Sequence, residues 1–270
     1  MQSHNHNGFA DVNGTRLYYE LAGSGEPLVL VHGFSLDTRM WEPQWEPFLQ
    51  GYQVLRYDLR GFGRSALPDG TGYQHHQDLK ALLDHLGIAS ATLLGHSTGG
   101  SVALDFAVSY PESTRALVLF GSIAGGYEFS PEFGAALQAI FASARERGID
   151  AAKEAWLRLL AYQPRADGAA EGDVYRMVAD YSGWHWLNED AVQPLALPAL
   201  QRLDAIRSPT LTILGERDVP DCFRIAELVN AAVPGAEHVM LPGLGHMANL
   251  EDPDRFNAAV LGFLARSAIR

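Results

Sequence analysis

One serine of this 270-residue chain stands between two glycines, in the segment 93–101 that reads LLGHSTGGS. Gly95 and Gly99 flank Ser97 at two-residue spacing, directly after the apolar run 91–94. Such a G-x-S-x-G turn from a strand into a helix can hold a serine hydroxyl outward as a nucleophile. The same glycines could serve an ordinary turn, because glycine accepts unusual backbone angles. The segment alone therefore makes Ser97 a candidate nucleophile but does not establish that role.

Two later segments supply the groups that would activate a serine. Residues 214–218 read LGERD and residues 242–246 read PGLGH, and each segment follows an apolar run. Serine is a weak nucleophile that needs a general base, and the base needs a group that fixes its tautomer. Ser97, Asp218 and His246 follow one another in an order known for nucleophile, acid and base on open α/β sheets. We therefore predict these three residues as the catalytic set.

Backbone donors for a developing oxyanion are expected from two loops. Residues 31–34 read VHGF and follow the apolar run 27–31, and the glycine lets this loop pass close to Ser97. The N–H groups of Phe34 and Thr98 could then face the same negative charge. We predict Phe34 and Thr98 as an oxyanion hole.

Neighbouring polar residues compete for these roles. His96 adjoins Ser97 but should point away from its hydroxyl at a sharp turn, and His32 is expected to order its loop through hydrogen bonds. Glu216 lies close to Asp218 and is the alternative acid. Asp221 follows Pro220 and precedes an apolar helix, so we interpret it as a helix N-cap.

The elements that position these residues are indicated by short apolar runs and helical periodicity. A strand is predicted at 15–20, after a tight turn, and nearly continuous apolar runs predict buried strands at 27–31, 52–57, 91–94, 115–120, 210–214 and 237–241. Amphipathic spacing predicts helices at 74–86, 98–110 and from 252 through 263. Alternating strands and helices favour an α/β fold.

The region 125–200 breaks this alternation. It has no convincing strand, is rich in aromatic residues, and favours helices at 133–147, 151–160 and 174–181. An all-helical insertion between two strands is best interpreted as a lid over the strand ends, where α/β sheets bind ligands. We expect a core of 1–124 and 201–270, a cap of 125–200, and Trp184 and Trp186 as apolar substrate contacts.

Composition excludes several classes of function. The chain has 20 basic and 32 acidic residues, a net charge of −12, which disfavours nucleic acid or an anionic membrane as a partner. Its one cysteine, Cys222, cannot form an internal disulfide and is expected to pack in the core. There is no run of 18 apolar residues, and the start MQSHNHNGF lacks a secretion-signal pattern. We expect a soluble, cytoplasmic protein.

Together these motifs make the chain resemble the α/β-hydrolase family over nearly its whole length. The residues that carry the resemblance are the strand at 15–20, VHGF at 31–34, DLRGFGRS at 58–65, GHSTGG at 95–100, GERD at 215–218 and GHM at 245–247. The resemblance implies an eight-stranded, mostly parallel sheet, a helical cap after the sixth strand, and chemistry without cofactor or metal. In this family Asp58 and Arg60 usually shape a loop. Some relatives carry the acid after the sixth strand, but residues 121–123 read GSI here.

Within that family the chain looks most like small esterases, enol-lactonases and C–C bond hydrolases. We expect hydrolysis of a small apolar ester or lactone through an acyl-enzyme on Ser97, with Ile123, Val219 and Met247 among the substrate contacts and a homodimer as one possible assembly. Cleavage of a β-diketone C–C bond, a cofactor-free perhydrolase and a non-catalytic small-ligand receptor stay open as alternatives. A haloalkane dehalogenase is excluded, because it needs a carboxylate where Ser97 stands.

Overall fold

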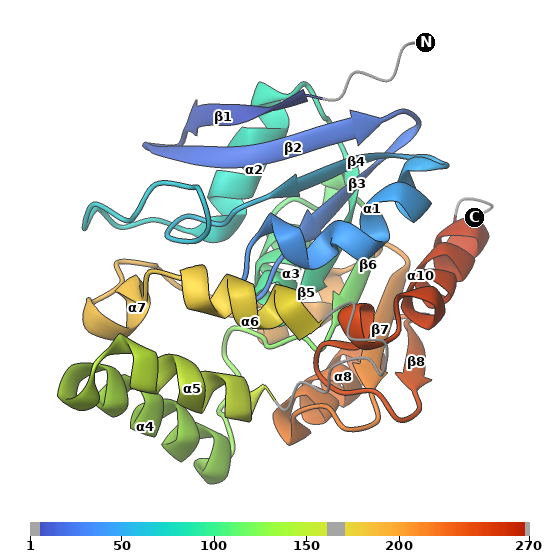
Figure 1. The fold of residues 1–270 in the computed structure, drawn as a ribbon. Helices are drawn as coiled ribbons and strands as arrows, with labels where there is room; N and C mark the ends of the chain where they lie inside the picture. The colour runs from blue at the N-terminus through green and yellow to red at the C-terminus, as the bar shows by residue number, and fades with distance from the viewer. Residues whose placement is uncertain (1–5, 161–170, 268–270) are drawn as a thin grey trace.

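A single twisted sheet of eight strands forms the centre of the molecule (Figure 1). The structure, a computed structural model, describes residues 6–160 and 171–267. The strands are β1 His6–Val12, β2 Thr15–Gly23, β3 Glu26–Val31, β4 Tyr52–Tyr57, β5 Ala91–His96, β6 Thr114–Phe120, β7 Thr210–Gly215 and β8 Glu237–Leu241. Their order in the sheet is β1-β2-β4-β3-β5-β6-β7-β8. The pairings β1–β2 and β2–β4 are antiparallel and all others are parallel, which confirms the mostly parallel sheet.

The first strand is the one that residue patterns did not predict. β1 pairs with β2 through a two-residue turn at Asn13 and Gly14, and both turn residues have positive φ angles. Only Ala10 of this edge strand is buried, so β1 has almost no apolar alternation to detect. Residues 1–5, which belong to the segment where no secretion signal was expected, lie outside the described residues.

Helices cover both faces of the sheet. The long ones of the core are α1 Glu42–Leu49, α2 His75–His85, α3 Thr98–Ser109, α8 Pro220–Ala232 and α10 Pro253–Ser267, and the short ones are η1 Thr38–Trp41, η2 Pro111–Ser113 and α9 Ala248–Glu251. Figure 1 shows α1 and α10 in front of the sheet and α2 and α3 behind it. All six residues of β5 and of β7 are buried, as expected for parallel strands covered on both sides. No helix among the described residues is long and apolar enough to cross a membrane.

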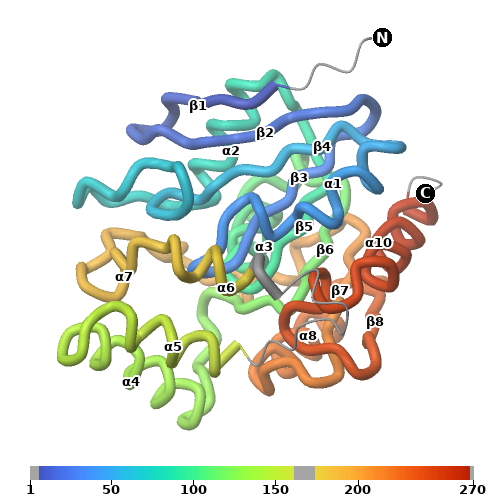
Figure 2. Tube along the Cα trace, viewed as in Figure 1, coloured from blue at the N-terminus to red at the C-terminus, as the bar shows by residue number. Residues whose placement is uncertain are grey.

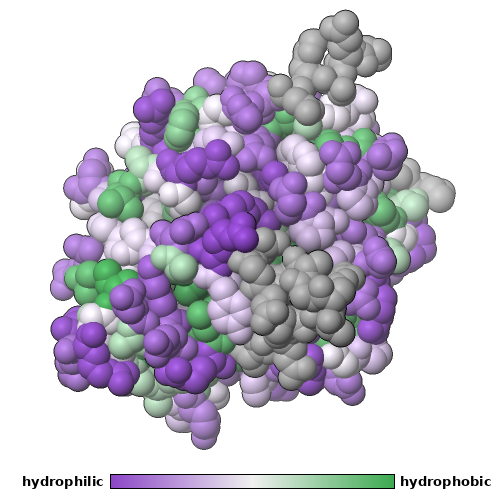
Figure 3. Space-filling view, viewed as in Figure 1, coloured by the Kyte–Doolittle hydropathy of each residue, from purple (hydrophilic) through white to green (hydrophobic). Residues whose placement is uncertain are grey.

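The segment between β6 and β7 forms a separate group of helices, here called the helical insertion (Figure 2). It contains α4 Pro131–Arg147, α5 Ile149–Leu159, α6 Glu171–Asp180 and α7 Trp184–Leu187, followed by η3 Ala199–Gln201 and η4 Leu203–Ala205. Ser130 caps α4, and its hydroxyl accepts a hydrogen bond from the backbone N–H of Phe133. Hydrophilic residues cover much of the face in Figure 3, and hydrophobic residues gather on the side of the helical insertion.

Specific polar contacts fasten the helical insertion to the core. The indole N–H of Trp156 donates to the hydroxyl of Ser35 at 2.6 Å, and both residues are buried. At another point the guanidinium of Arg39 pairs with the carboxylate of Asp180 at 2.8 Å. The hydroxyl of Tyr73 donates to Asp190 at 2.9 Å. The helical insertion is therefore attached to the core at three different segments.

The loop after β4 is organised by buried charges. The carboxylate of Asp58 accepts hydrogen bonds from the backbone N–H groups of Thr38 and Arg64, each at 2.8 Å. The guanidinium of Arg60 contacts both carboxylate oxygens of Asp78, at 2.8 and 2.9 Å. The side chains of this pair are only 3% and 1% exposed. Asp58 and Arg60 therefore hold backbone and helix α2 in place, as expected from the resemblance.

We predict that Arg60→Ala lowers the free energy of unfolding by about 3–5 kcal/mol, because it removes the cation beside the buried Asp78 carboxylate and leaves the Asn13 amide as its remaining side-chain donor among the described residues. Urea unfolding followed by circular dichroism measures the change. The control is Arg224→Ala, which breaks an exposed pair with Glu227 and should cost less than about 1 kcal/mol. Equal losses in the two variants would contradict the structural role of the buried pair.

Candidate active site

Ser97 occupies a strained turn between β5 and α3. Its backbone angles are φ 51° and ψ −113°, outside the regions that non-glycine residues prefer. The N–H of Ser97 donates to the carbonyl of Phe120 at 3.0 Å, and its own carbonyl accepts from the N–H of Ile123 at 3.2 Å. Residues at the end of β6 and just after it therefore hold the backbone on both sides of Ser97. The side chain of Ser97 is half-buried.

Glycine is required on both sides of this serine by close backbone approach. A Cβ atom at Gly95 would collide with the carbonyl of Gly99. A Cβ atom at Gly99 would collide with the carbonyl oxygens of Val31 and His32, at the end of β3. The G-x-S-x-G pattern thus reflects three backbone segments in contact, and an ordinary turn does not require this.

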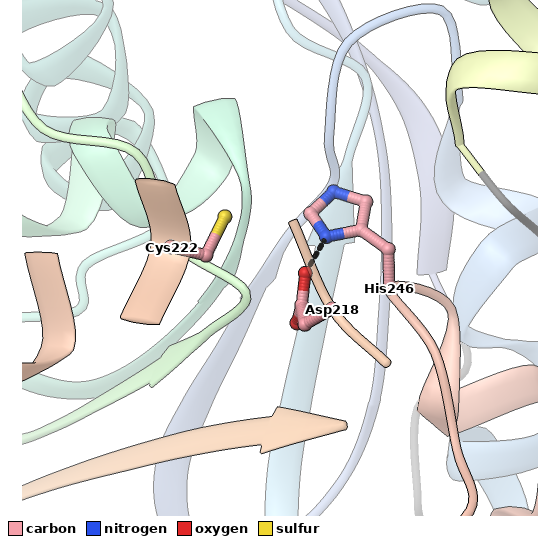
Figure 4. Close-up of side chains that lie close together, drawn as sticks. All are labelled: Asp218, Cys222 and His246. Atoms are coloured by element: carbon pink, nitrogen blue, oxygen red, sulfur yellow. Dashed lines mark hydrogen bonds and ion pairs between the residues drawn. The ribbon is translucent and has the colours of Figure 1, made fainter. Parts of the chain in front are cut away.

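His246 and Asp218 meet beside this turn. His246 Nδ1 and Asp218 Oδ1 lie 2.6 Å apart, and the two residues are 4% and 6% exposed (Figure 4). Because a carboxylate only accepts, Nδ1 carries the proton and Nε2 is left as an acceptor. The backbone N–H of Arg217 donates to the carbonyl of Leu244 at 2.8 Å and joins the two loops. No hydrogen bond joins Ser97 to His246 within the described residues, which is common before substrate binds.

The imidazole of His246 is packed between the ends of two strands. A Cβ atom at Gly121, which directly follows β6 and has φ 50°, would lie 2.9 Å from His246 Nδ1. On another side the ring of His96 lies 4.6 Å from that of His246, centroid to centroid. His96 Nε2 donates to the backbone carbonyl of His246 at 3.0 Å, and burial lowers the pKa of His96 well below its usual value. His96 therefore supports the His246 loop as a neutral donor.

The backbone N–H groups of Phe34 and Thr98, near Ser97, have no acceptor among the described residues. Gly33 brings the Phe34 loop close, since a Cβ atom there would lie 3.3 Å from the Cβ of Ser97. Phe34 and Thr98 line one cavity together with Ile123. Unpaired N–H groups beside a nucleophile can stabilise an oxyanion.

The remaining polar candidates have structural partners. His32 Nε2 accepts from the N–H of Leu59 at 2.9 Å, and its Nδ1 donates to the carbonyl of Gly33 at 2.8 Å, so His32 orders the loop. Glu216 is exposed and accepts from the N–H of Gly243.

The prediction that Asp221 caps α8 is wrong, because Val219 occupies the cap position. The Asp221 carboxylate instead accepts two 2.7 Å hydrogen bonds from Ser130, one from the backbone N–H and one from the hydroxyl.

Two cavities flank the candidate site. The first, of about 290 Å³, is lined by Phe34, Thr98 and Ile123 among others. The second, of about 330 Å³, is lined by Asp218, Val219 and His246 among others.

The other residues expected at the substrate line neither cavity within the described chain. Met247 is fully buried in the core, and Trp186, 1% exposed, packs its ring against Phe34 at 6.0 Å between centroids. Trp184 is partly exposed and packs on His185.

Cys222 is buried, as the sequence predicted, but sequence reasoning missed that it lies next to this pair. Cys222, on the first turn of α8, is four residues from Asp218, and one ligand atom from each of Asp218, Cys222 and His246 lies within 4.8 Å of the others (Figure 4). Such a trio could hold a metal ion. However, the thiol donates to the carbonyl of Gly121, and burial raises the pKa of Cys222 well above its usual value. A neutral thiol and an imidazole already bound to a carboxylate make a poor metal site.

Comparisons with known proteins found relatives in both sequence and structure. Residues 28–259 match the model of the alpha/beta hydrolase family. A putative carbamate hydrolase of Azorhizobium caulinodans is 30% identical over 96% of both chains. A 2-hydroxy-6-oxo-6-phenylhexa-2,4-dienoate hydrolase of Burkholderia cepacia is 29% identical over 93% of this chain and 91% of its own. The crystal structure of an enol-lactonase from Burkholderia xenovorans superposes with a TM-score of 0.80, at 27% identity, over 96% of this chain and 100% of that one.

We predict that Cys222 reacts slowly with thiol reagents in the folded protein. Because its pKa is raised, the thiolate fraction at pH 8 is below that of an ordinary cysteine, and the sulfur is buried. Absorbance of the thionitrobenzoate released from Ellman's reagent should rise at least about tenfold more slowly in the native protein than in 8 M urea. Rapid stoichiometric reaction of the native protein would contradict a neutral, buried thiol.

Proposed function

Because the chain belongs to the alpha/beta hydrolase family, we propose that it is a serine hydrolase that cleaves a carboxylic ester or lactone through an acyl-enzyme on Ser97. The observation that carries the proposal is the 2.6 Å hydrogen bond between His246 and Asp218, beside a serine held at φ 51°. Because Nδ1 of the buried imidazole donates its hydrogen bond to Asp218, Nε2 is the ring nitrogen that can accept a proton as the general base. Neither a binding module nor an ordinary turn would require this arrangement.

In the first half-reaction Ser97 Oγ attacks the carbonyl carbon while His246 Nε2 takes the hydroxyl proton. The carbonyl oxygen becomes an oxyanion that the N–H groups of Phe34 and Thr98 bind. When the tetrahedral intermediate collapses, the bond to the leaving alkoxide breaks and His246 returns the proton to it. Asp218 stabilises the transient imidazolium. In the second half-reaction water, deprotonated by His246, attacks the acyl-enzyme, and Ser97 leaves with the returned proton.

The two cavities fit the two parts of such a substrate. His246 must reach the leaving oxygen, so the alcohol part lies on the side of the second cavity, which His246 and Val219 line. The acyl part then enters the first cavity, beside Phe34, Thr98 and Ile123. We propose that Trp186, which does not line this cavity, affects it through the ring of Phe34, against which it packs.

C–C bond cleavage is the second candidate, because a relative is named as a dienoate hydrolase. A dienoate of this kind carries its carboxylate on the leaving part, which would lie in the second cavity. The arginine that lines that cavity within the described chain, Arg217, already contacts Glu251 and the carbonyl of Gly243. An uncharged ester or lactone therefore fits better. A panel of p-nitrophenyl esters, lactones, an aryl carbamate, a dienoate ketone and an ester with added hydrogen peroxide, ranked by kcat/KM, separates these reactions.

We predict that Ser97→Ala and His246→Ala each lower kcat for a p-nitrophenyl ester by about 10⁴-fold or more, because nucleophile and base act as one unit. Circular dichroism should show both variants folded. His85→Ala, which removes an exposed imidazole at the end of α2, is the matched control and should keep wild-type turnover. Wild-type-like turnover in Ser97→Ala would end the assignment.

We also predict that a chelator leaves the activity unchanged. The proposed steps use a protein base and backbone donors, and Cys222 near the site is held as a neutral thiol. The test is turnover after dialysis against EDTA, compared with turnover after zinc is added back. Activity that is lost in EDTA and restored by zinc would assign a metal role to Asp218, Cys222 and His246.

A further inference from the structure

The first cavity has one wall that ester cleavage does not explain. On one side lie the aromatic rings of Phe34 and Phe62. On another side lie His75 and His76, at the start of α2, and Asp105, on α3 two turns beyond Ser97. The aromatic-rich sequence of the helical insertion favoured an apolar pocket, whereas titratable side chains of both parts line this one: these three from the core, and His185 and Asp190 from the insertion.

None of these three side chains has a hydrogen-bond or ion-pair partner within the described residues. The atoms Asp105 Oδ1 and His75 Nδ1 are buried without a partner. Polar atoms buried in proteins nearly always have a hydrogen-bond partner, and exceptions often mark functional sites. Three unpaired polar side chains in the wall of one cavity therefore indicate a polar ligand.

The charges of this wall restrict the kind of ligand. Burial lowers the pKa of His75 to about 3, so its imidazole is neutral and offers one donor and one acceptor. Burial also raises the pKa of Asp105 to about 6, and its carboxyl is an acceptor above that pH. No lysine or arginine from the described chain lines the cavity, so a carboxylate would meet no cation.

Resting on the proposed ester cleavage, we propose that the first cavity selects an acyl group that carries a hydroxyl. The hydroxyl donates a hydrogen bond to Asp105, and the carbon chain of the acyl group packs against Phe34 and Phe62. A hydroxyl both donates and accepts, so it also suits a neutral imidazole of His75 or His76. An ammonium group could not accept a hydrogen bond, and a plain alkyl chain would leave the Asp105 oxygen buried without a partner.

A metal ion is a poorer explanation of this wall. Two histidines and an aspartate are common ligand types. However, within the described residues the trio whose ligand atoms all lie within 4.8 Å of one another is Asp218, Cys222 and His246. The ligand atoms of His75, His76 and Asp105 do not all lie this close together. Their spacing therefore fits an organic group that spans the cavity better than a metal ion.

The test measures binding, so it does not depend on turnover. Isothermal titration with four anilides compares acyl groups of similar size: N-phenylbutanamide, its 3-hydroxy and 4-hydroxy derivatives, and N-phenylsuccinamic acid. In the wild type we expect at least one hydroxylated anilide to bind about tenfold more tightly than N-phenylbutanamide, because its hydroxyl donates a hydrogen bond to a charged acceptor. We expect N-phenylsuccinamic acid to bind more weakly than N-phenylbutanamide. Equal binding of all four anilides, or no binding of any, would overturn the proposal.

Variants assign the preference to Asp105. Asp105→Asn should reduce the tenfold preference to about twofold or less, and Asp105→Leu should reverse it in favour of N-phenylbutanamide. Asp254→Asn, on the exposed start of α10, is the matched control and should keep the wild-type ranking. Thermal unfolding checks that each variant is folded. A hydroxyl preference that survives both Asp105 variants would overturn the assignment.

The outcomes separate the two proposals. If Ser97→Ala abolishes ester turnover while the anilides show no hydroxyl preference, the hydrolase proposal stands and the selectivity proposal fails. If Ser97→Ala keeps turnover while the preference depends on Asp105, the cavity binds the predicted group but the reaction is another one.

Discussion

The site depends on a single backbone constraint, the turn at Ser97. There the chain passes from β5 into α3 at φ 51°, and it can do so only because Gly95 and Gly99 let three backbone segments touch. The turn is fastened to the end of β6 through Phe120. A strained residue persists where its surroundings over-determine it. The spacing of β3, β5 and β6 therefore sets the direction of the serine hydroxyl, and the large buried core supplies the energy that holds it.

The sequence predicted the features that depend on local chemistry. Glycine patterns located the turn at Ser97. Nearly continuous apolar runs located six strands, because strands inside a parallel sheet are buried on both faces, and the strand after the tight turn at 13–14 was located as well. β1 was missed since an edge strand with one buried residue has no clear alternation. α7, with four residues, is too short for helical periodicity to show.

Long-range partners could not be predicted from the sequence. Asp221 has the local signature of a cap, but its partner Ser130 is 91 residues away, and nothing in the local pattern indicates that bond. The position of Cys222 beside Asp218 depends on how α8 starts after β7. Aromatic composition likewise does not show which way the side chains of the insertion point. Rings such as Trp156 and Trp186 join the helical insertion to Phe34, while polar groups of α2, α3 and the insertion itself line the cavity.

The bond between Trp156 and Ser35 links the insertion to the candidate oxyanion donor. Ser35 has φ 62°, follows Phe34 directly in the chain, and receives the indole N–H at 2.6 Å. The Phe34 ring also packs against Trp156, 5.2 Å between centroids. A displacement of α5 would therefore also displace the peptide that carries the Phe34 N–H. In this molecule the helical insertion and the loop that carries the candidate oxyanion donor are joined by a hydrogen bond and a ring contact, so a shift of one would also move the other.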